Sequence, residues 1–367
     1  MIARHLHLLQ TVLSQPVSPF HEDAVIELAR AWAAERGVGF DQDAAGNVLL
    51  RYRRKARGHP KQPRWVFTAH MDHPGFLTKR QRARTVWADF RGSVGEPYMV
   101  GSGVRLFAPG GDVPAVVTSA KRLGVARWWA CRLELPEPAR VPPQTIGMWD
   151  LPAFRRRGTR IHARACDDLA GTAAVLCALD DLVEHEIAAD VLGLLTRAEE
   201  AGFVGALGAC RLGTIPKRAL VVGLEASKAQ PSAGLGDGAV IRVGDHMRTF
   251  DPSLTALISR VAQELTKADA ARRFTRRLMP GGTCESTVYC AFAHQAAALC
   301  LPLGNYHNMG RGEKIAAEQI DAGDFEALVA LLVALATQGR RPADTDADLR
   351  AYMERLWAER RDYLRDG

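Results

Sequence analysis

Long hydrophobic runs are absent from this sequence. The longest, Ala327 to Ala336, falls well short of the roughly 20 apolar residues that a membrane-spanning helix needs. The segment Met1 to Leu13 contains Arg4 and two histidines, and no small-residue cleavage site follows it, so we expect no secretory signal. These absences lead us to expect a cytoplasmic protein without a membrane partner.

Paired cysteines and clustered aromatic residues are also lacking. The seven cysteines have no metal-ligand spacing and lie mostly in apolar runs, so we expect reduced core thiols. The net charge is +7, but the basic residues are spread along the chain, and aromatic residues make up only 7% of it. Because no basic patch is interleaved with aromatic side chains, we expect no specific nucleic-acid partner and only weak attraction to polyanions.

The length of 367 residues exceeds what one hydrophobic core usually supports. We expect a main domain formed by residues 1–88 and 158–340. Frequent glycine and proline between short apolar pieces indicate an inserted all-β domain at 89–157. For residues 341–367 we expect a polar linker, Pro342 to Asp348, and a charged helix with Met353 and Trp357 on one face.

The main domain has the alternating pattern of an α/β protein. A helix is expected over Ile2–Ser14, and Ser18-Pro19 is expected to open a second one. Buried strands are expected at Trp65–Ala69, before Glu199, and at Ala219–Leu224. The pattern predicts a mostly parallel, doubly wound sheet flanked by helices.

Charged residues gather where these strands end. His70 and Asp72 follow the first strand, Glu199 and Glu200 the second, and Glu225 the third. Further charged groups are Asp167 before a helix and His307 late in the chain, with Cys284 at a helix start, where an inert buried thiol is the favoured interpretation. Taken singly, each acid is explained by a helix cap or a favourable helix dipole, and each histidine by core packing.

Taken together, they predict a ligand site, because a doubly wound sheet brings the carboxyl ends of its strands to one crevice. Histidines and carboxylates suit zinc or similar divalent ions, and a shared carboxylate allows two ions to bind side by side. A further carboxylate would act as general base on a water molecule. This chemistry favours two-metal hydrolysis, with an amide bond as one plausible target.

The residues that carry a resemblance come in a fixed order along nearly the whole chain. They are Ala69-His70-Met71-Asp72, Cys166-Asp167-Asp168, Glu199-Glu200-Ala201-Gly202, Gly223-Leu224-Glu225, Gly281-Gly282-Thr283 and Tyr306-His307-Asn308. In this order they resemble the glutamyl/deblocking aminopeptidase family of dinuclear zinc exopeptidases, which includes the tetrahedral aminopeptidases.

The resemblance implies a role for each residue. The metal ligands would be His70, Asp167, Glu200, Glu225 and His307, with Asp167 bridging two divalent ions. Zinc is expected, with cobalt or manganese as alternatives. Glu199 would be the general base toward a water bridging the ions, and Asp72 would orient His70. The resemblance also implies short peptide substrates and a homo-oligomer, from a dimer to a dodecamer, in which the β-domain takes part.

The sequence departs from the family pattern at several places: Leu169, His73-Pro74, Glu225 and the acid Glu285 behind Cys284. The ligand set survives these changes. Two alternatives stay open beside an aminopeptidase. One is a related two-metal N-acyl-amino-acid deacylase or carboxypeptidase. The other is a non-catalytic assembly or polyanion-binding protein.

Overall fold

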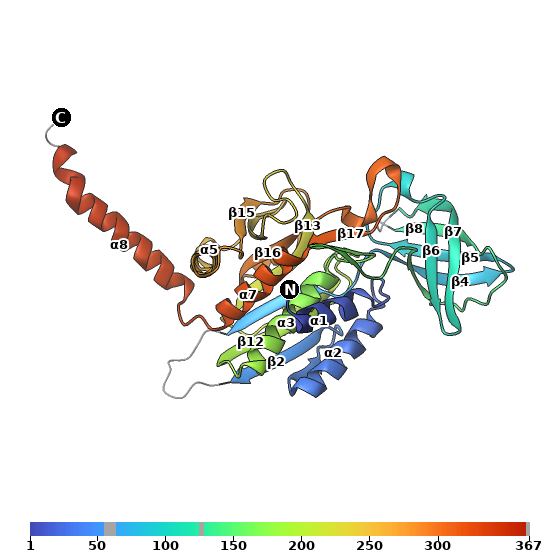
Figure 1. The fold of residues 1–367 in the computed structure, drawn as a ribbon, viewed down its shortest axis with the longest axis horizontal. Helices are drawn as coiled ribbons and strands as arrows, with labels where there is room; N and C mark the ends of the chain where they lie inside the picture. The colour runs from blue at the N-terminus through green and yellow to red at the C-terminus, as the bar shows by residue number, and fades with distance from the viewer. Residues whose placement is uncertain (55–63, 125–127, 365–367) are drawn as a thin grey trace.

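An eight-stranded sheet forms the centre of the molecule (Figure 1). The computed structural model describes residues 1–54, 64–124 and 128–364; most of the basic segment 53–64 lies outside the described residues. The strand order is β1-β2-β12-β3-β13-β16-β14-β15. The bounds are Gly39–Gln42 for β1, Val48–Arg54 for β2, Trp65–His70 for β3, Ala189–Thr196 for β12, Leu220–Lys228 for β13, Ala239–Gly244 for β14, Phe274–Leu278 for β15 and Gln295–Leu303 for β16.

The middle of this sheet is parallel. Strands β12, β3, β13 and β16 pair in parallel, whereas β2 joins β12, and β14 joins β16, in antiparallel register. The central strands are buried along their length, as parallel strands covered on both faces must be. The expected mostly parallel α/β sheet is confirmed.

Helices cover both faces of the sheet. On one face, Phe67 and Val222 pack in the main core with helices α1, α2, α3, α5 and α7. On the other, Val66 and Val221 pack with α4 and α6. The helix bounds are Ala3–Leu13 for α1, Asp23–Arg36 for α2, Leu169–Glu184 for α3, Val204–Leu212 for α4, Pro252–Ala268 for α5, Glu285–Ala291 for α6 and Ala322–Ala336 for α7. Side chains that alternate along a strand therefore supply two separate cores.

The second helix begins later than Ser18-Pro19. Ser18 and His21 pair through their backbones in a short bridge, and the Phe20 amide donates to the Glu22 carboxylate over 2.8 Å. Because Phe20 also has a positive φ of 72°, the chain turns before α2 can start at Asp23.

A closed six-stranded barrel follows β3 (Figure 1). Its strands are β4 (Gly75–Arg82), β5 (Thr85–Arg91), β6 (Gly103–Ala108), β7 (Gly111–Arg122), β8 (Trp129–Glu134) and β9 (Ile146–Trp149). Phe76, Phe90 and Trp149 fill its interior, with ring centroids 4.9 to 5.4 Å apart. The barrel begins before residue 89, the expected start of the insertion, because β4 and β5 lack the frequent glycine and proline on which that boundary depends.

A small sheet and several short helices complete the body. The sheet contains β10 (Arg155–Arg157), β11 (Arg160–Ala163) and β17 (Glu318–Asp321). The 3-10 helices are η1 (Glu96–Tyr98), η2 (Tyr306–Asn308), η3 (Arg311–Glu313) and η4 (Arg361–Leu364). All seven cysteines are free, and none of the described helices is both long and apolar enough to cross a membrane.

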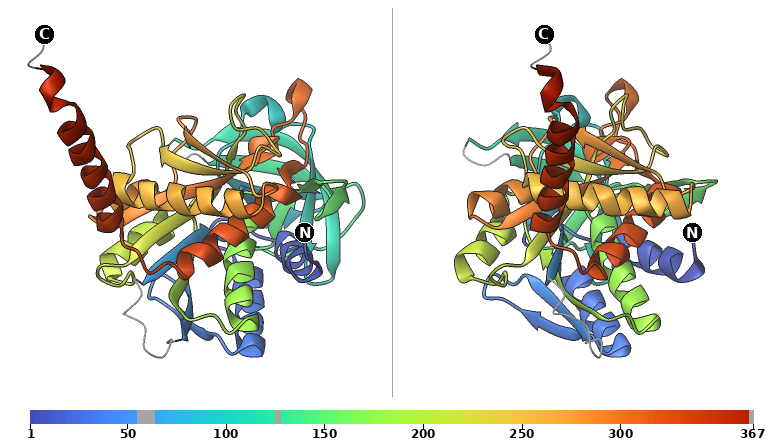
Figure 2. Two further views of the ribbon diagram at one scale, coloured as in Figure 1. Left: turned by 60° about the vertical axis from the view of Figure 1, so that its left-hand side comes forward. Right: turned by 90° about the vertical axis from the view of Figure 1, so that its left-hand side faces the viewer.

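The C-terminal helix α8 (Pro342–Arg360) stands away from the rest of the molecule in every view (Figure 2). The linker expected at Pro342 to Asp348 is wrong, since these residues form its first turns. Pro342 occupies an early helical position, and Asp344 accepts a hydrogen bond from the Arg341 amide over 2.7 Å. Both features favour a helix start, although the same residues are polar enough to be typical of a loop.

Candidate metal centre and substrate cavity

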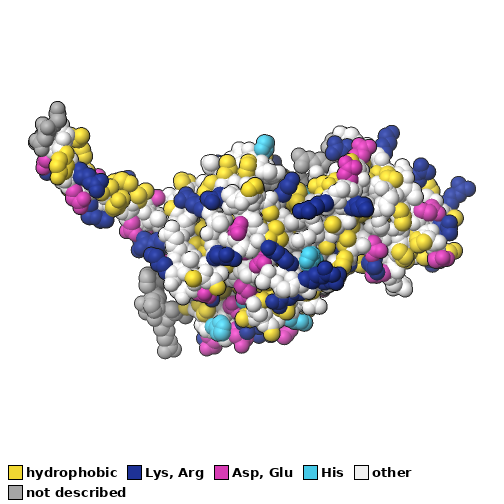
Figure 3. All heavy atoms as spheres, turned by 45° about the horizontal axis from the view of Figure 1, so that its top comes forward, with side chains coloured by type: hydrophobic (Ala, Val, Ile, Leu, Met, Phe, Trp, Pro, Cys, Tyr) yellow, Lys and Arg dark blue, Asp and Glu magenta, His cyan; other side chains and the backbone are white. Residues whose placement is uncertain are grey.

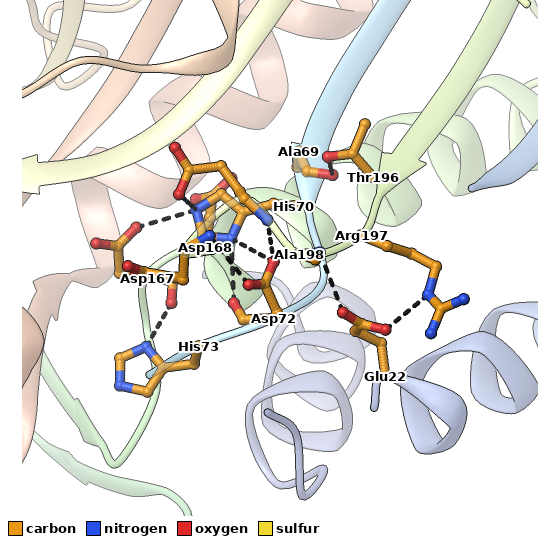
Figure 4. A network of polar contacts seen from close by, with 12 residues as sticks. Glu22, Ala69, His70, Asp72, His73, Asp167, Asp168, Thr196, Arg197 and Ala198 are labelled. Atoms are coloured by element: carbon orange, nitrogen blue, oxygen red, sulfur yellow. Dashed lines mark hydrogen bonds and ion pairs between the residues drawn. The ribbon is translucent and has the colours of Figure 1, made fainter. Parts of the chain in front are cut away.

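The side chains expected to bind metal converge at the carboxyl ends of the central strands. Figure 4 shows two of them, His70 and Asp167. His70 ends β3, Glu225 lies near the end of β13, and Glu200 follows β12. Asp167 lies two residues before α3, and His307 lies in η2 just beyond β16. Parallel pairing of β12, β3, β13 and β16 brings these segments to one edge of the sheet.

These five residues form two groups that share Asp167. In the first, the Nε2 atom of His70 lies 3.5 Å from Asp167 Oδ1 and 3.7 Å from Glu225 Oε1. In the second, the Nε2 atom of His307 lies 3.6 Å from Asp167 Oδ2 and 3.0 Å from Glu200 Oε1. Within each group the candidate ligand atoms all lie within 4.8 Å of one another. Each of the two Asp167 oxygens therefore faces a different histidine.

Both histidines are oriented by backbone carbonyls. The Nδ1 atom of His70 lies 3.1 Å from the Asp72 carbonyl, and that of His307 lies 2.5 Å from the Ser93 carbonyl in the segment after β5. An Nδ1–H that donates to a carbonyl leaves the Nε2 lone pair free for a cation. In both rings that lone pair faces the shared carboxylate.

The charges of the site fit divalent cations. Asp167 Oδ1 is buried and, among the described residues, has no hydrogen-bond partner. Burial raises the pKa of Glu225 to about 8, with Asp167 adding to the effect, and burial also raises the pKa of Glu199 well above its usual range. Burial favours the protonated form of Asp167 too, but the nearby imidazoles of His307 and His70 outweigh it and lower the pKa of Asp167. Such crowded buried carboxylates need positive charge to stay ionised, and oxygen and imidazole donors suit zinc.

Glu199 belongs to neither metal group, although it lies beside them. Its Oε2 atom is 4.0 Å from the Nε2 atom of His70, and its side chain lines the adjoining cavity. Because the two groups are complete without it, this carboxylate is available for proton transfer.

Asp72 was expected to orient His70 through its carboxylate, but it contacts the ring mainly through its backbone carbonyl. The hydrogen bond to His70 comes from its backbone carbonyl, while its Oδ1 atom lies 3.4 Å from the ring Nδ1. The carboxylate accepts hydrogen bonds from the backbone amides of Glu199 and Glu200, over 2.9 and 3.1 Å (Figure 4 shows Asp72 below the imidazole). Asp72 therefore ties the turn after β12 to the end of β3.

Two supporting residues have no place in the sequence prediction. Glu318 in β17 accepts backbone hydrogen bonds from Cys166, Asp167 and His307 over 2.7 to 3.0 Å. His73 joins the Asp167 carbonyl to the side chain of Asn308, over 2.6 and 3.0 Å. The signal for Glu318 is weak, since it is one of two acids in a strand of only four residues.

Cys284 and Glu285 lie behind the site. Burial raises the pKa of the Cys284 thiol to about 12, with neighbouring carboxylates opposing its ionisation. Glu285 accepts a hydrogen bond from the Tyr289 hydroxyl over 3.1 Å. Burial therefore disfavours the thiolate, which is the reactive form of a cysteine.

A cavity of about 700 Å³ opens over the metal groups. Trp128 of the barrel segment lines one part of it, and Arg242, Lys228 and His246 line another. The Arg242 side chain is 2% exposed and donates to the Ser227 hydroxyl over 2.9 Å, while its Nε atom has no partner among the described residues. The cavity therefore has acids at the metal end and basic groups along its side.

The family model of the M42 glutamyl aminopeptidases matches residues 136–322, about half of the chain. That range includes Asp167, Glu199, Glu200, Glu225 and His307, but begins after His70. No curated protein matches the sequence.

Several solved structures share the fold. The TET1 peptidase of Pyrococcus horikoshii, described as assembling into a tetrahedron or a large octahedral shell, has a TM-score of 0.73 and 20% identity over 91% of this chain and 99% of that one. A TET aminopeptidase from a marine-sediment archaeon of the Thaumarchaeota has a TM-score of 0.74 and 18% identity over 91% and 96%. An aminopeptidase of Desulfurococcus kamchatkensis has the same TM-score and identity over 94% and 97%.

Proposed function

Because the chain belongs to the M42 glutamyl aminopeptidase family, we propose that it is a metal-dependent aminopeptidase that removes N-terminal residues from short peptides. One observation carries the proposal: two His-carboxylate groups share Asp167 at the end of a cavity that also contains the spare carboxylate of Glu199. This arrangement suits the hydrolysis of a bond held across two cations.

In this proposal His70 and Glu225 would hold one divalent cation, Glu200 and His307 would hold the other, and Asp167 would be shared by the two sites. Zinc suits the donor set best, and cobalt or manganese are the alternatives. When bound, the two cations would polarise the scissile carbonyl and lower the pKa of the attacking water.

Glu199 takes the proton from the attacking water and delivers it to the leaving amine. Its position beside His70 and at the cavity wall supports this role. Burial raises its pKa, so its carboxylate is a stronger base than an exposed glutamate. Asp72 holds the backbone of Glu199 in place through the hydrogen bond to its amide.

The cavity also suggests which N-terminal residue is preferred. Arg242, Lys228 and His246 line it beyond the acids of the metal groups. A buried guanidinium with unused donor capacity binds a carboxylate strongly. We therefore propose that glutamyl and aspartyl peptides are better substrates than neutral or basic ones.

Assembly and location complete the proposal. The related TET1 peptidase is described as a tetrahedron or an octahedral shell, and by analogy we propose a homo-oligomer between a dimer and a dodecamer. We propose a cytoplasmic location, consistent with seven free cysteines.

The test is residue release from a mixed peptide library in free and N-acetylated forms, after chelation and after addition of zinc, cobalt or manganese. Metal-restored release from free peptides, with acidic residues first, is the expected result. Release only from acetylated substrates would instead indicate a deacylase, and release from the C-terminus a carboxypeptidase. No release with any metal would leave the non-catalytic alternative.

A further inference from the structure

Helix α8 is attached to the body of the molecule only near its beginning. Asp346 accepts a hydrogen bond from Ser253 over 2.5 Å, and Asp348 pairs with Arg260 over 2.6 Å, both on α5. Pro342 is the helix's only buried residue. Beyond this attachment the helix stands clear of the body (Figure 2).

The free part of α8 displays an apolar stripe. Leu349, Met353 and Leu356 are spaced by four and three residues, which places them on one side of the helix, and Tyr363 follows in η4. Leu349 is 56% and Met353 51% exposed, and Trp357 beside them is 54% exposed. Figure 3 shows apolar side chains along the projecting helix between charged ones.

A stripe of this kind is costly in water. Burying each large apolar side chain contributes roughly 1.5 to 3 kcal/mol, and a helix of this length without tertiary packing is only marginally stable. The structure therefore points to a partner that covers the stripe.

We propose that α8 pairs in antiparallel orientation with α8 of a second copy of this chain. The charges along the helix support this partner. Antiparallel pairing with Met353 and Leu356 at its centre sets Glu354 level with the partner's Arg355 and Arg350 level with the partner's Glu359. Parallel pairing would instead set each of these charges against its own copy, and Arg360 against Arg360 within the stripe.

The register follows from the same residues. The twofold axis passes between Met353 and Leu356. Met353 then faces the partner's Leu356, and Tyr352 lies level with the partner's Trp357. The helix is about 28 Å long at 1.5 Å per residue. Because each helix projects, the two bodies lie at opposite ends of the pair and do not collide. The tip of each helix, Tyr363 and Leu364, then reaches the surface of the other body.

The test compares the mass of the full chain in solution with that of three α8 variants. The first, Leu356→Glu with Trp357→Glu, removes the stripe. The second variant makes the helix acidic through Arg355→Glu, Arg360→Glu and Arg361→Glu. The third makes it basic through Glu354→Arg, Glu359→Arg and Asp362→Arg. Sedimentation velocity is the measurement.

We expect the wild-type mass to be about twice that of each variant alone, because a twofold contact joins particles in pairs. Mixing the acidic and basic variants should restore the wild-type mass, whereas mixing either with the stripe variant should not. Equal masses for the wild type and the stripe variant would overturn the proposal. If the masses are equal and only the wild type binds phosphatidylserine vesicles, the stripe is a membrane contact and the proposal is likewise overturned.

This inference is independent of the proposed function. Peptidase activity measured on the same samples should be unchanged by all three variants. Absence of activity in every sample would contradict the aminopeptidase and leave the comparison of masses intact.

Discussion

Glu199 and Glu200 are neighbours in the sequence with different places in the site, and this difference is testable at the scale of single residues. Glu200 lies 3.0 Å from the Nε2 atom of His307, while Glu199 stands outside both metal groups. Glu199→Gln should lower kcat by about a hundred- to ten-thousandfold, as expected for a lost general base, and leave two metal ions bound. Glu200→Gln should lose one ion. Metal content and kcat measured together separate the two, and loss of metal from Glu199→Gln would contradict the assignment.

Arg242 is the residue on which substrate preference should depend. Arg242→Met removes the buried guanidinium that lines the cavity. We expect kcat/KM for glutamyl peptides to fall by about 10- to 100-fold, because a charge-assisted contact is lost, with little change for leucyl peptides. Arg248→Met, at an exposed position, is the matched control. An equal fall for both peptides would indicate a structural role instead.

Glu318 supports three backbone amides of the site with one carboxylate. Glu318→Gln leaves a single acceptor oxygen and turns an amide group toward backbone N–H donors. We expect the free energy of unfolding to fall by about 2 kcal/mol and zinc affinity to fall by about 10- to 100-fold. Thermal denaturation and calorimetric zinc titration are the measurements. Glu313→Gln, at an exposed position in η3, should change neither.

At the scale of whole elements, His5 joins three helices. Its ring lies on α1, 3.1 Å from Asp181 of α3 and 3.1 Å from Glu326 of α7. Burial lowers the pKa of His5, but the hydrogen bonds to Asp181 and Glu326 outweigh burial. Together they raise the pKa of His5 from its ordinary value of 6.5 to about 9. The protonated ring thus stabilises the fold fully below about pH 6.5 and loses that effect as pH rises through about 9.

His5→Asn should therefore lower the free energy of unfolding by about 2 kcal/mol at pH 6, which is less than the full pKa difference of His5 would give. The difference from wild type should shrink by pH 10, because the wild-type ring is then neutral too. Thermal denaturation across this range checks the prediction. His7→Asn is the control, since His7 is exposed on the same helix. A difference that does not change with pH would mean that packing, and not charge, is what His5 contributes.

The elements that the sequence predicts well are those with one strong pattern. The apolar segments of β3 and β13 and most of helix α3 are buried, so each is a nearly continuous apolar run in the sequence. Helix α5 is absent from the prediction, although Asp251 caps it and Pro252 opens it, because its charged exposed face interrupts the apolar pattern. Among the site residues, the acids at strand ends stand out in the sequence. The backbone contacts of Asp72, Ser93 and Glu318 do not, because they depend on the tertiary fold.

At the scale of the whole molecule, bound metal should raise the free energy of unfolding. The two metal groups hold buried carboxylates close together, and a cation that binds only the folded chain stabilises it. Chelation should lower the free energy of unfolding by about 3 kcal/mol relative to a hundredfold excess of metal over Kd. Differential scanning calorimetry with zinc, cobalt and manganese checks this and ranks the ions. An unchanged melting temperature would contradict a two-metal centre.

The carbonyl of Ser93 reaches His307 from the barrel side of the chain. Trp128, also from that side, lines the cavity. The two domains are consequently not interchangeable modules. A different barrel of the same outline would leave the Nδ1 atom of His307 without the carbonyl that orients its ring. Any redesign of this scaffold that alters the barrel for a new assembly must carry Ser93 and its backbone geometry along, and the same requirement limits how freely evolution could have exchanged the two parts.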